Sequence, residues 1–316
     1  MEKLIATRDA FGEALLELGE EYKNLVVLTA DLAGSTRVKK FSQKFPQRFF
    51  NMGIAEQNMI GVAAGLAQCG KIVVVTSFAI FASGRAWEQI RYSISHSHSN
   101  VKIVATHGGI SVGEDGASHQ GTEDISLMRT IPGMKVIIPA DGVETKKVIR
   151  AVLKIKDPVY IRLGRPKVPV IFNEDYPFQI GKGYKIKQGK DVSIFACGIM
   201  LYEALKSEEK LRKEEISAEV INISTIKPLD KRIIINSVRS TGAVVTAEEH
   251  QVIGGLGSAV AETLGENYPV PLERIGIKDK FGESGKVEEL LKKYKLTSDD
   301  IYKAAKKAVW RKNEKK

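Results

Sequence analysis

The chain has 316 residues, of which 43% are hydrophobic and 27% are charged, and its formal net charge at pH 7 is +10. This composition is typical of a globular protein with about two domains, and no apolar run approaches the roughly 18 residues that a membrane-spanning helix needs. The lysines mostly alternate with glutamates, as in "KSEEKLRKEE", and the sequence lacks zinc-finger spacing, an aromatic-basic RNA motif and a basic helix, so we expect neither nucleic-acid binding nor membrane insertion.

Short β-branched runs predict five strands in the first half of the chain. Segments of helical period, such as "GVETKKVIRAVLKI", separate them. The runs cover residues 25–30, 71–77, 101–107, 134–140 and 158–164. Strands that alternate with helices form parallel sheets with helices on both faces. We therefore predict a doubly wound α/β domain over residues 1–165.

A proline-rich stretch, "RPKVPVIFNEDYP", has no convincing periodicity and predicts a linker over residues 166–190. The α/β alternation then restarts, with strands expected in "DVSIFACG", "SAEVINIS", "GAVVTAEE" and "VPLERIGI", each followed by a helix. The last helix should begin after Thr297, whose side chain can cap it while Asp300 faces back toward the cap. A second α/β domain is therefore expected over residues 191–316.

Four loops that follow predicted strands of the first domain are rich in functional groups. They read "ADLAGST", "SFAIFASGRAW", "THGGISVGEDGASHQGTED" and "RLGRP". Ligands of open α/β sheets bind beyond the carboxyl ends of the strands, so we expect these loops to form a single site. The segment "GIAEQNM" adds a carboxylate, because Glu56 opens an apolar, glycine-rich helix in which a buried charge needs a partner.

Each of these features also has a plainer interpretation. A glutamate at a helix start is commonly a solvated residue that the helix dipole favours. Phe78 and Phe81 could belong to the core beside a strand. The loop from His107 to His119 is harder to explain as structure alone, because histidines, acidic residues and glycines make a poor core. Metal binding is the rival for this loop, but its histidines are twelve residues apart with no cysteine nearby, and the histidines of "SHSHS" are expected to be solvated.

Two further sequence patterns do not indicate a functional site. The glycines of "GGLGSAVAE" do not directly follow a strand, and no acidic residue stands at the distance that dinucleotide binding requires, so we interpret them as a helix start at an interface. Cys69 and Cys197 lie far apart and form neither a disulfide framework nor metal-ligand spacing. The start, "MEKLIATRDAF", has no long apolar segment, and we expect a soluble protein of the cytoplasm.

The order and spacing of several motifs resemble the pyrimidine-binding domain of transketolases. These motifs are "FFNMGIAEQNMIGVAAGLA", "TSFAIF", "THGGISVGEDGASHQGTEDISLMRTIPGM" and "IPADGVET". The rest of the chain resembles the transketolase C-terminal domain, so the resemblance covers essentially all 316 residues. Deoxyxylulose-phosphate synthase and the beta subunit of 2-oxoacid dehydrogenases share the "IAEQ" theme. The resemblance implies a thiamine diphosphate enzyme that transfers a two-carbon ketol unit between sugar phosphates.

The resemblance also implies roles for particular residues. The glutamate that matches Glu56 contacts N1′ of the cofactor's aminopyrimidine ring and supports removal of the C2 proton. Phe78 and Phe81 match aromatic residues that pack on this ring, and Asp31 matches a residue near the cofactor. The candidate catalytic residues are therefore Glu56 and His119.

Other loop residues match groups that bind the sugar substrates. His119 and Asp115 match residues that contact hydroxyl groups near the reacting carbons, and His107 lies on the route to the acceptor phosphate. The residues that match the phosphate-binding groups are Arg8, Ser35 and Arg165. Arginine suits this task because its planar fork can donate paired hydrogen bonds to a dianion.

One part of the family's cofactor site is missing from the sequence. Thiamine diphosphate enzymes hold the diphosphate and its metal with a Gly-Asp-Gly motif followed by an asparagine, and "GEDG" lies instead in the sugar-binding loop. The first strand also begins too early for a diphosphate-binding domain to precede it. We therefore expect no metal ligands in this chain and a split transketolase, in which an N-terminal partner subunit supplies the Gly-Asp-Gly motif and holds Mg²⁺ or Ca²⁺.

Such an enzyme would contain two copies of each chain, a heterotetramer that serves carbohydrate metabolism in the pentose phosphate pathway. Two other interpretations remain open at this point, a 2-oxoacid dehydrogenase beta subunit and a non-catalytic α/β binding module. The "GEDGASHQG" loop fits polyhydroxylated substrates better than a small oxoacid. A binding module would have no use for Glu56 and Phe78.

Overall fold

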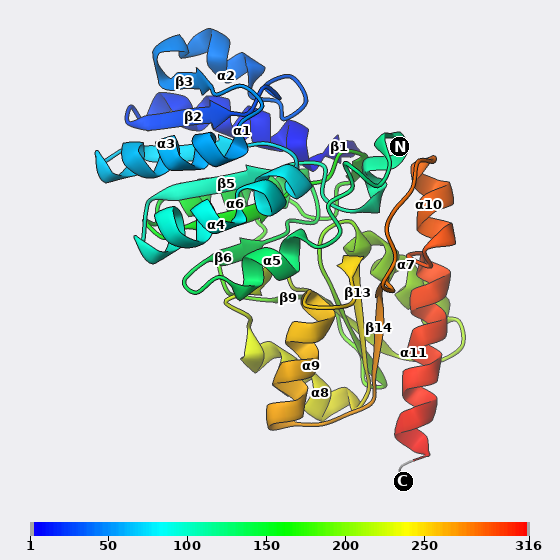
Figure 1. Ribbon diagram of the computed structural model, residues 1–316. Coiled ribbons are helices and arrows are strands. Elements are labelled where there is room, and N and C mark those ends of the chain that lie inside the picture. Colours follow the sequence, from blue (N-terminus) through cyan, green and yellow to red (C-terminus); the bar gives the residue numbers. More distant parts are fainter. Residues whose placement is uncertain (1–2, 315–316) are drawn as a thin grey trace.

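The computed structural model describes residues 3–314 (Figure 1). Its largest sheet has seven strands in the order β12-β6-β7-β5-β4-β2-β3. All neighbouring pairs are parallel except β12 with β6. The strands are β2 (Leu25–Thr29), β3 (Phe49–Asn51), β4 (Ile72–Thr76), β5 (Val101–Ala105), β6 (Lys135–Ile137), β7 (Val159–Arg162) and β12 (Thr225–Lys227). The doubly wound sheet predicted for the first domain is confirmed.

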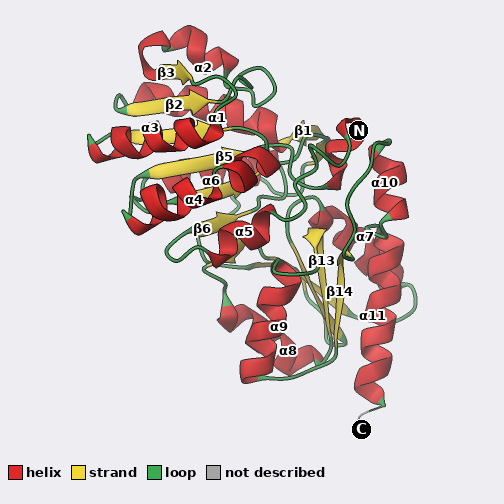
Figure 2. Ribbon diagram, in the orientation of Figure 1, coloured by secondary structure: helices red, strands yellow, loops and turns green. Residues whose placement is uncertain are grey.

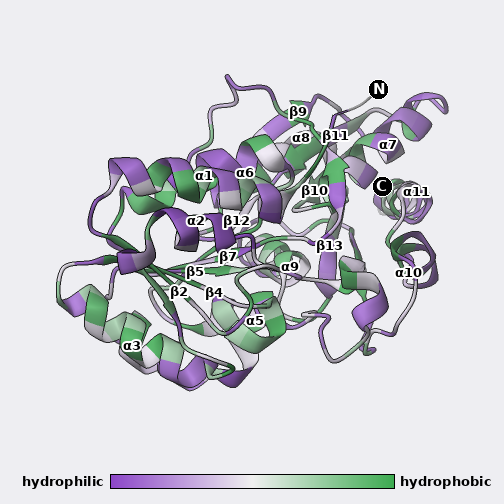
Figure 3. Ribbon diagram, turned by 90° about the horizontal axis from the view of Figure 1, so that it is seen from above, coloured by the Kyte–Doolittle hydropathy of each residue, from purple (hydrophilic) through white to green (hydrophobic). Residues whose placement is uncertain are grey.

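Helices cover both faces of this sheet because its central strands are apolar on both sides. Every residue of β2, β4 and β5 is buried, as expected for parallel strands between two helical layers. On one face α1 (Thr7–Glu21) and α6 (Gly142–Leu153) share an apolar core with alternate strand residues. On the other face lie α3 (Glu56–Gln68) and α5 (Asp124–Thr130), as Figure 3 shows from above.

The second sheet has five strands in the order β14-β13-β10-β11-β9, and only β9 is antiparallel to its neighbour. Its strands are β9 (Tyr184–Lys187), β10 (Val192–Ala196), β11 (Ala218–Asn222), β13 (Val244–Gln251) and β14 (Leu272–Ile277). Helices α7 (Met200–Arg212) and α11 (Ser298–Asn313) pack on one face, and α8 (Lys231–Thr241) and α9 (Leu256–Asn267) pack on the other (Figure 2). The expected second α/β domain is therefore present.

The predicted cap of the last helix is also observed. The Thr297 side chain bonds to the N3 backbone, and the Asp300 carboxylate accepts from the Thr297 backbone N–H at 3.2 Å. This reciprocal capping box satisfies two backbone donors that the first turn of α11 would otherwise leave unpaired. Helix α11 begins at Ser298 for this reason.

Two strand pairings join segments whose contact sequence periodicity does not predict. Strand β1 (Leu4–Ala6) pairs antiparallel with β8 (Lys167–Pro169), inside the stretch predicted as linker. Strand β12 belongs by sequence to the second half of the chain but extends the first sheet beside β6. Both pairings involve three-residue strands, which are too short to show a period of two.

The shorter helices complete the fold. They are α2 (Lys39–Lys44), α4 (Trp87–Gln89) and α10 (Val287–Lys293), with π-helical segments at Phe81–Arg85 and Ile90–His96 and 3₁₀ segments at Pro46–Arg48 and Ile110–Asp115. Among residues 3–314, no helix is both long and apolar enough to cross a membrane.

Candidate active site

The residues predicted for the site gather where the parallel strands of the seven-stranded sheet end. The loops after β2, β4, β5 and β7 meet there, and the loop before α3 joins them. This is where open α/β sheets bind ligands. The residues concerned are Arg8, Asp31, Ser35, Glu56, Phe78, Phe81, His107, Asp115, His119 and Arg165.

Glu56 is the first residue of α3, and only 3% of its side chain is exposed. Ser77 Oγ donates to Glu56 Oε1 at 3.3 Å. Arg85 Nη1 lies 3.3 Å from Oε2 and 3.4 Å from Oε1. The positive end of the helix dipole and the arginine together compensate a carboxylate that has almost no water around it. Glu56 therefore opens a helix and is buried, as expected, and Arg85 is its charged partner.

Four rings form a wall next to this carboxylate. Phe78 stacks on the His107 ring with centroids 3.8 Å apart and planes inclined by 27°. Phe81 lies 5.7 Å from Phe78 with planes inclined by 20°. His119 meets Phe81 edge-on at 5.2 Å and Phe78 at 6.0 Å. Nearly parallel aromatic faces beside a buried carboxylate suit a flat, nitrogen-containing ring.

Arg8 joins two of the predicted substrate-binding loops. Its Nη1 lies 3.2 Å from the Ser35 carbonyl oxygen and 3.1 Å from His107 Nε2. Arg8 Nε is buried and has no hydrogen-bond partner within the described residues. Burial, followed by the nearby Arg37 guanidinium, lowers the pKa of Arg8. Clustered cations with an unused donor would gain from a bound anion.

The contacts of His107 indicate which of its nitrogens carries the proton. Arginine can only donate, so Nε2 accepts from Arg8, and Nδ1 then donates to Thr106 Oγ1 at 2.8 Å. Burial, and then the charges of Arg8 and Arg165, lower the pKa of His107 to about 3. This imidazole is therefore neutral at ordinary pH, and its backbone has a positive φ of 58°.

The remaining predicted residues lie at the rim. Arg165 Nη1 is 3.5 Å from Asp115 Oδ1 and also donates to a carbonyl oxygen of the His107–His119 loop. Asp31 is exposed and accepts from Asn51 Nδ2 at 2.9 Å, in the segment that leads to α3. Both pairs are accessible to a ligand.

A buried arginine fixes the loop that carries the two histidines. Arg162, at the end of β7, donates to Asp124 Oδ2 at 3.0 Å and to the carbonyl oxygens of Gly121 and Glu249 at 2.9 and 2.8 Å. The Glu249 carboxylate in turn accepts from the Ser111 backbone N–H. Because Glu249 belongs to β13, the second domain helps to position the site loop of the first.

Several residues of this site were not singled out from the sequence. Arg85 stands within "SFAIFASGRAW", four residues after Phe81, but an arginine in a loop gives no sign of its partner. Ser77 and Arg162 are inside or next to strands, where their side chains would be assigned to packing. No cluster of three or more His, Cys, Asp or Glu side chains within residues 3–314 is arranged to hold a metal ion.

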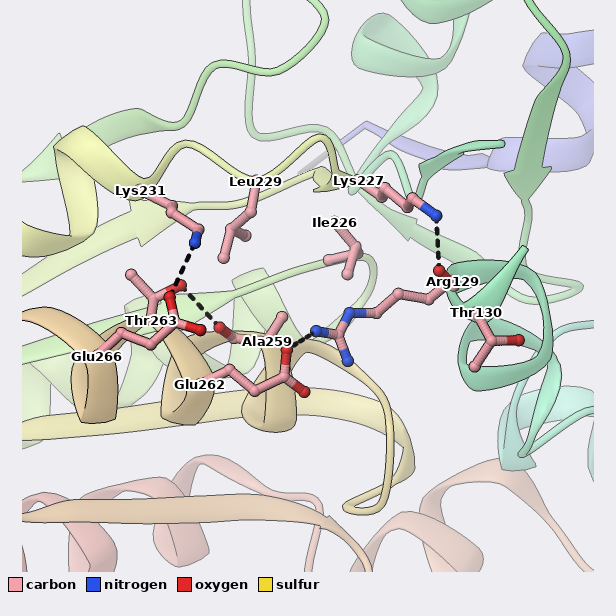
Figure 4. A pocket seen from close by; sticks show the side chains of 10 residues that line it. All are labelled: Arg129, Thr130, Ile226, Lys227, Leu229, Lys231, Ala259, Glu262, Thr263 and Glu266. Carbon is pink, nitrogen blue, oxygen red and sulfur yellow. Dashed lines mark hydrogen bonds and ion pairs between the residues drawn. The ribbon is translucent and has the colours of Figure 1, made fainter. Parts of the chain in front are cut away.

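A separate pocket of about 400 Å³ lies between α5, the β12–α8 loop and α9 (Figure 4). Arg129 pairs with Glu262, and Lys231 pairs with Glu266 at 3.1 Å. Lys227 Nζ donates to two carbonyl oxygens at the end of α5. These cations are already paired within the chain, so we interpret the pocket as a junction between the domains and not as an anion site.

Comparisons with known proteins agree with this architecture. The transketolase pyrimidine-binding domain model matches residues 3–170, and the transketolase C-terminal domain model matches residues 181–301. The chain is 54% identical over 299 residues to a protein of Methanocaldococcus jannaschii named as a transketolase C-terminal section, with 94% of each chain covered. It is 46% identical over 306 residues to a 6-deoxy-6-sulfo-D-fructose transketolase subunit of a Clostridium species, covering 97% of this chain and 95% of that one.

A solved structure is similar over nearly the whole chain. It is described as a split-gene transketolase in an inactive β4 tetramer and superposes with a TM-score of 0.91 at 52% identity, covering 98% of this chain and 99% of that one. The two matched domain models together account for both sheets. The chain therefore belongs to the transketolase family and carries its pyrimidine-binding domain followed by its C-terminal domain.

Proposed function

We propose that this chain is one subunit of a split transketolase that transfers a two-carbon ketol unit between ketose and aldose phosphates. The observation that carries the proposal is the buried Glu56 carboxylate beside the Phe78–Phe81 wall, with the Arg8 cluster at the same end of the sheet. The first group of residues suits a cofactor ring, and the second suits a phosphorylated substrate. Neither a 2-oxoacid dehydrogenase subunit nor a simple binding module would need both.

The residues fit the aminopyrimidine half of thiamine diphosphate. A buried carboxylate can donate or share a proton with a ring nitrogen, and Phe81 offers a flat apolar face for the ring. When bound, thiamine diphosphate supplies the carbon nucleophile for ketol transfer. Glu56 would hold the proton at N1′, while Phe78 and Phe81 would fix the orientation of the ring.

Substrate groups would bind along the same border of the sheet. Arg8 and Arg165, with Ser35, would hold the phosphate by charge-assisted hydrogen bonds. His119 and Asp115 would contact hydroxyl groups near the reacting carbons. A neutral His107 would accept a hydrogen bond at Nε2, from Arg8 or from a substrate hydroxyl on the route to the phosphate, and it would add no further charge to the cluster.

The diphosphate and its metal ion, Mg²⁺ or Ca²⁺, would be held by a second polypeptide. That N-terminal subunit would carry the Gly-Asp-Gly motif, and two copies of each chain would form the active enzyme. The similarity to a protein described as a split-gene transketolase supports this assembly, since its β4 tetramer is described as inactive. Residues 1–165 and 191–316 would form the two domains, and β9 of the segment between them adds an edge strand to the second sheet.

The experiment is reconstitution. Xylulose 5-phosphate and ribose 5-phosphate are supplied, with thiamine diphosphate and Mg²⁺, to this chain alone, to the partner alone and to the mixture. Only the mixture should transfer the ketol unit, and a Glu56→Gln mixture should assemble but lose orders of magnitude in rate because the amide cannot deliver the proton. Ketol transfer by this chain alone would refute the split arrangement. Sulfofructose as donor would test the specificity named for the Clostridium relative.

A further inference from the structure

The guanidinium of Arg85 lies where two cofactor-binding residues meet. Its Cζ is 4.1 Å from the centroid of the Phe81 ring. Its Nη1 is within 3.4 Å of both carboxylate oxygens of Glu56. One side chain thus contacts both the aromatic face and the carboxylate that the proposed function assigns to the aminopyrimidine ring.

The shape of this group is suited to that position. A guanidinium is planar, offers N–H donors at its rim and stacks on aromatic faces. A protonated aminopyrimidine has the same features, so both would use the Phe81 face and the Glu56 oxygens. Phe78, the other aromatic residue of the proposed cofactor site, is already stacked on the His107 ring, with the two centroids 3.8 Å apart. The guanidinium and the ring would therefore compete for one place.

The contacts that hold Arg85 there are weak enough to be exchanged. Its side chain is 51% exposed, whereas that of Glu56 is 3% exposed. The distances of 3.3 and 3.4 Å exceed those of a strong charge-assisted hydrogen bond, about 2.7–2.9 Å. Gln57 Nε2 donates to the Arg85 carbonyl oxygen at 3.1 Å, so the backbone is held while the side chain faces solvent.

We infer that Arg85 occupies the position of the aminopyrimidine ring in the chain without cofactor, and that the ring binds by displacing its guanidinium from Phe81 and Glu56. The inference rests on the proposed function. In the free chain the arginine compensates a buried carboxylate that would otherwise face Ser77 alone. Ligand binding then exchanges one flat cationic partner for another and leaves no charge unpaired.

The test is equilibrium binding of thiamine diphosphate to the complex with the partner subunit, in Mg²⁺, for wild type, Arg85→Ala and Arg85→Lys. If Arg85 must be displaced, the apparent affinity for thiamine diphosphate equals the intrinsic affinity multiplied by the fraction of sites that Arg85 leaves open. Arg85→Ala should therefore bind the cofactor roughly three- to tenfold more tightly than wild type. Arg85→Lys keeps the charge but loses the planar fork, and its affinity should fall between the other two. The ratio between wild type and Arg85→Ala should shrink as salt screens the ion pair.

Arg150→Ala is the matched control, because Arg150 is a half-exposed arginine paired with Glu21 on the other face of the sheet. Its affinity should equal that of wild type. Unchanged or weaker binding by Arg85→Ala, with wild type binding normally, would overturn the inference and leave the proposed function standing. Failure of every variant and of wild type to bind would overturn the proposed function and the inference with it. A cofactor-bound crystal structure that kept Arg85 on both Phe81 and Glu56 would also overturn it.

Discussion

At the scale of single residues, we propose that one set of groups in the site binds a phosphate and another set lies near the reacting carbon. Arg8 lies against His107 and Arg165 lies at the rim beside Asp115, whereas His119 belongs to the aromatic wall and meets Phe81 edge-on. The loop sequences predicted that these residues share one edge of the sheet, whereas the individual roles are implied by the resemblance to transketolases and remain predictions. The partner of Glu56 could not be, because contacts between Glu56 and Arg85 depend on how two loops fold together.

Variants of the arginines should affect substrate binding more than turnover. Arg8→Ala or Arg165→Ala should raise KM for phosphorylated acceptors by roughly ten- to a hundredfold, since a charge-assisted hydrogen bond contributes about 1.5 to 3 kcal/mol. The loss should shrink for an unphosphorylated aldehyde. His119→Ala should instead lower kcat for both acceptors, because contacts near the reacting carbon strengthen in the transition state. Steady-state constants for erythrose 4-phosphate and for an unphosphorylated aldehyde check this, and equal losses on both acceptors would place the arginines in the scaffold.

His107 should make the folded chain sensitive to acid. The folded state keeps this imidazole neutral down to a pKa of about 3, while an unfolded chain takes up the proton near pH 6.5. The unfolded state therefore binds more protons between these values, and stability falls as pH falls, by roughly 3 kcal/mol between pH 6.5 and pH 4. Urea unfolding over this range should show a shallower pH dependence for His107→Gln than for wild type. Parallel curves for the two proteins would contradict the assignment.

At the scale of elements, hydrophobic periodicity predicted the long strands and helices, but it did not predict the irregular segments. The buried strands β2, β4 and β5 and the helix that follows β6 are where the sequence predicts them. The π-helical segment Phe81–Arg85 departs from the regular repeat, and it ends at the arginine that reaches Glu56. Such segments arise from local packing and often occur at functional sites, so a period of 3.6 residues does not reveal them.

The cap of α11 allows a test at this scale. Thr297→Ala should lower the free energy of unfolding by about 1 kcal/mol, because the first turn of the helix loses an acceptor for a backbone N–H. Thr297→Ser keeps the hydroxyl group and should stay close to wild type. Chemical denaturation of the three proteins measures the difference. If serine and alanine were equally costly, the threonine methyl group and not the cap would be responsible.

At the scale of the whole molecule, the sequence predicted two α/β domains but not how they join. The junction contains Arg162, whose guanidinium bonds to Asp124 and to a carbonyl oxygen of Glu249 in the other domain. A single buried arginine in a strand has no periodic signature. Its position beneath the site loop links domain packing to the geometry of His107 and His119.

Two arginines at this junction should contribute very different amounts to the free energy of unfolding. Arg162→Met should cost roughly 3 to 5 kcal/mol of unfolding free energy, because it leaves the Asp124 carboxylate buried without its cation. Arg129→Ala removes a more exposed pair with Glu262 across the same junction and should cost less than about 1 kcal/mol. The free energies of unfolding of the two variants are measured by urea denaturation and compared with that of wild type. Equal costs would mean that burial of the pair is not what makes Arg162 important.

The antiparallel strand β12 also affects where the chain can be truncated without exposing a sheet edge. It comes from the second half of the sequence, yet it hydrogen-bonds to β6 of the first sheet. A shortened chain that ended near residue 170 would keep β6 without its outer neighbour, and a row of unpaired N–H and C=O groups would face water. Such rows recruit strands from other copies. The first half of this chain, expressed by itself, should therefore tend to aggregate, and the loss of second-half side chains such as Ile226 and Leu256 would also open the apolar cluster on the α3 and α5 side.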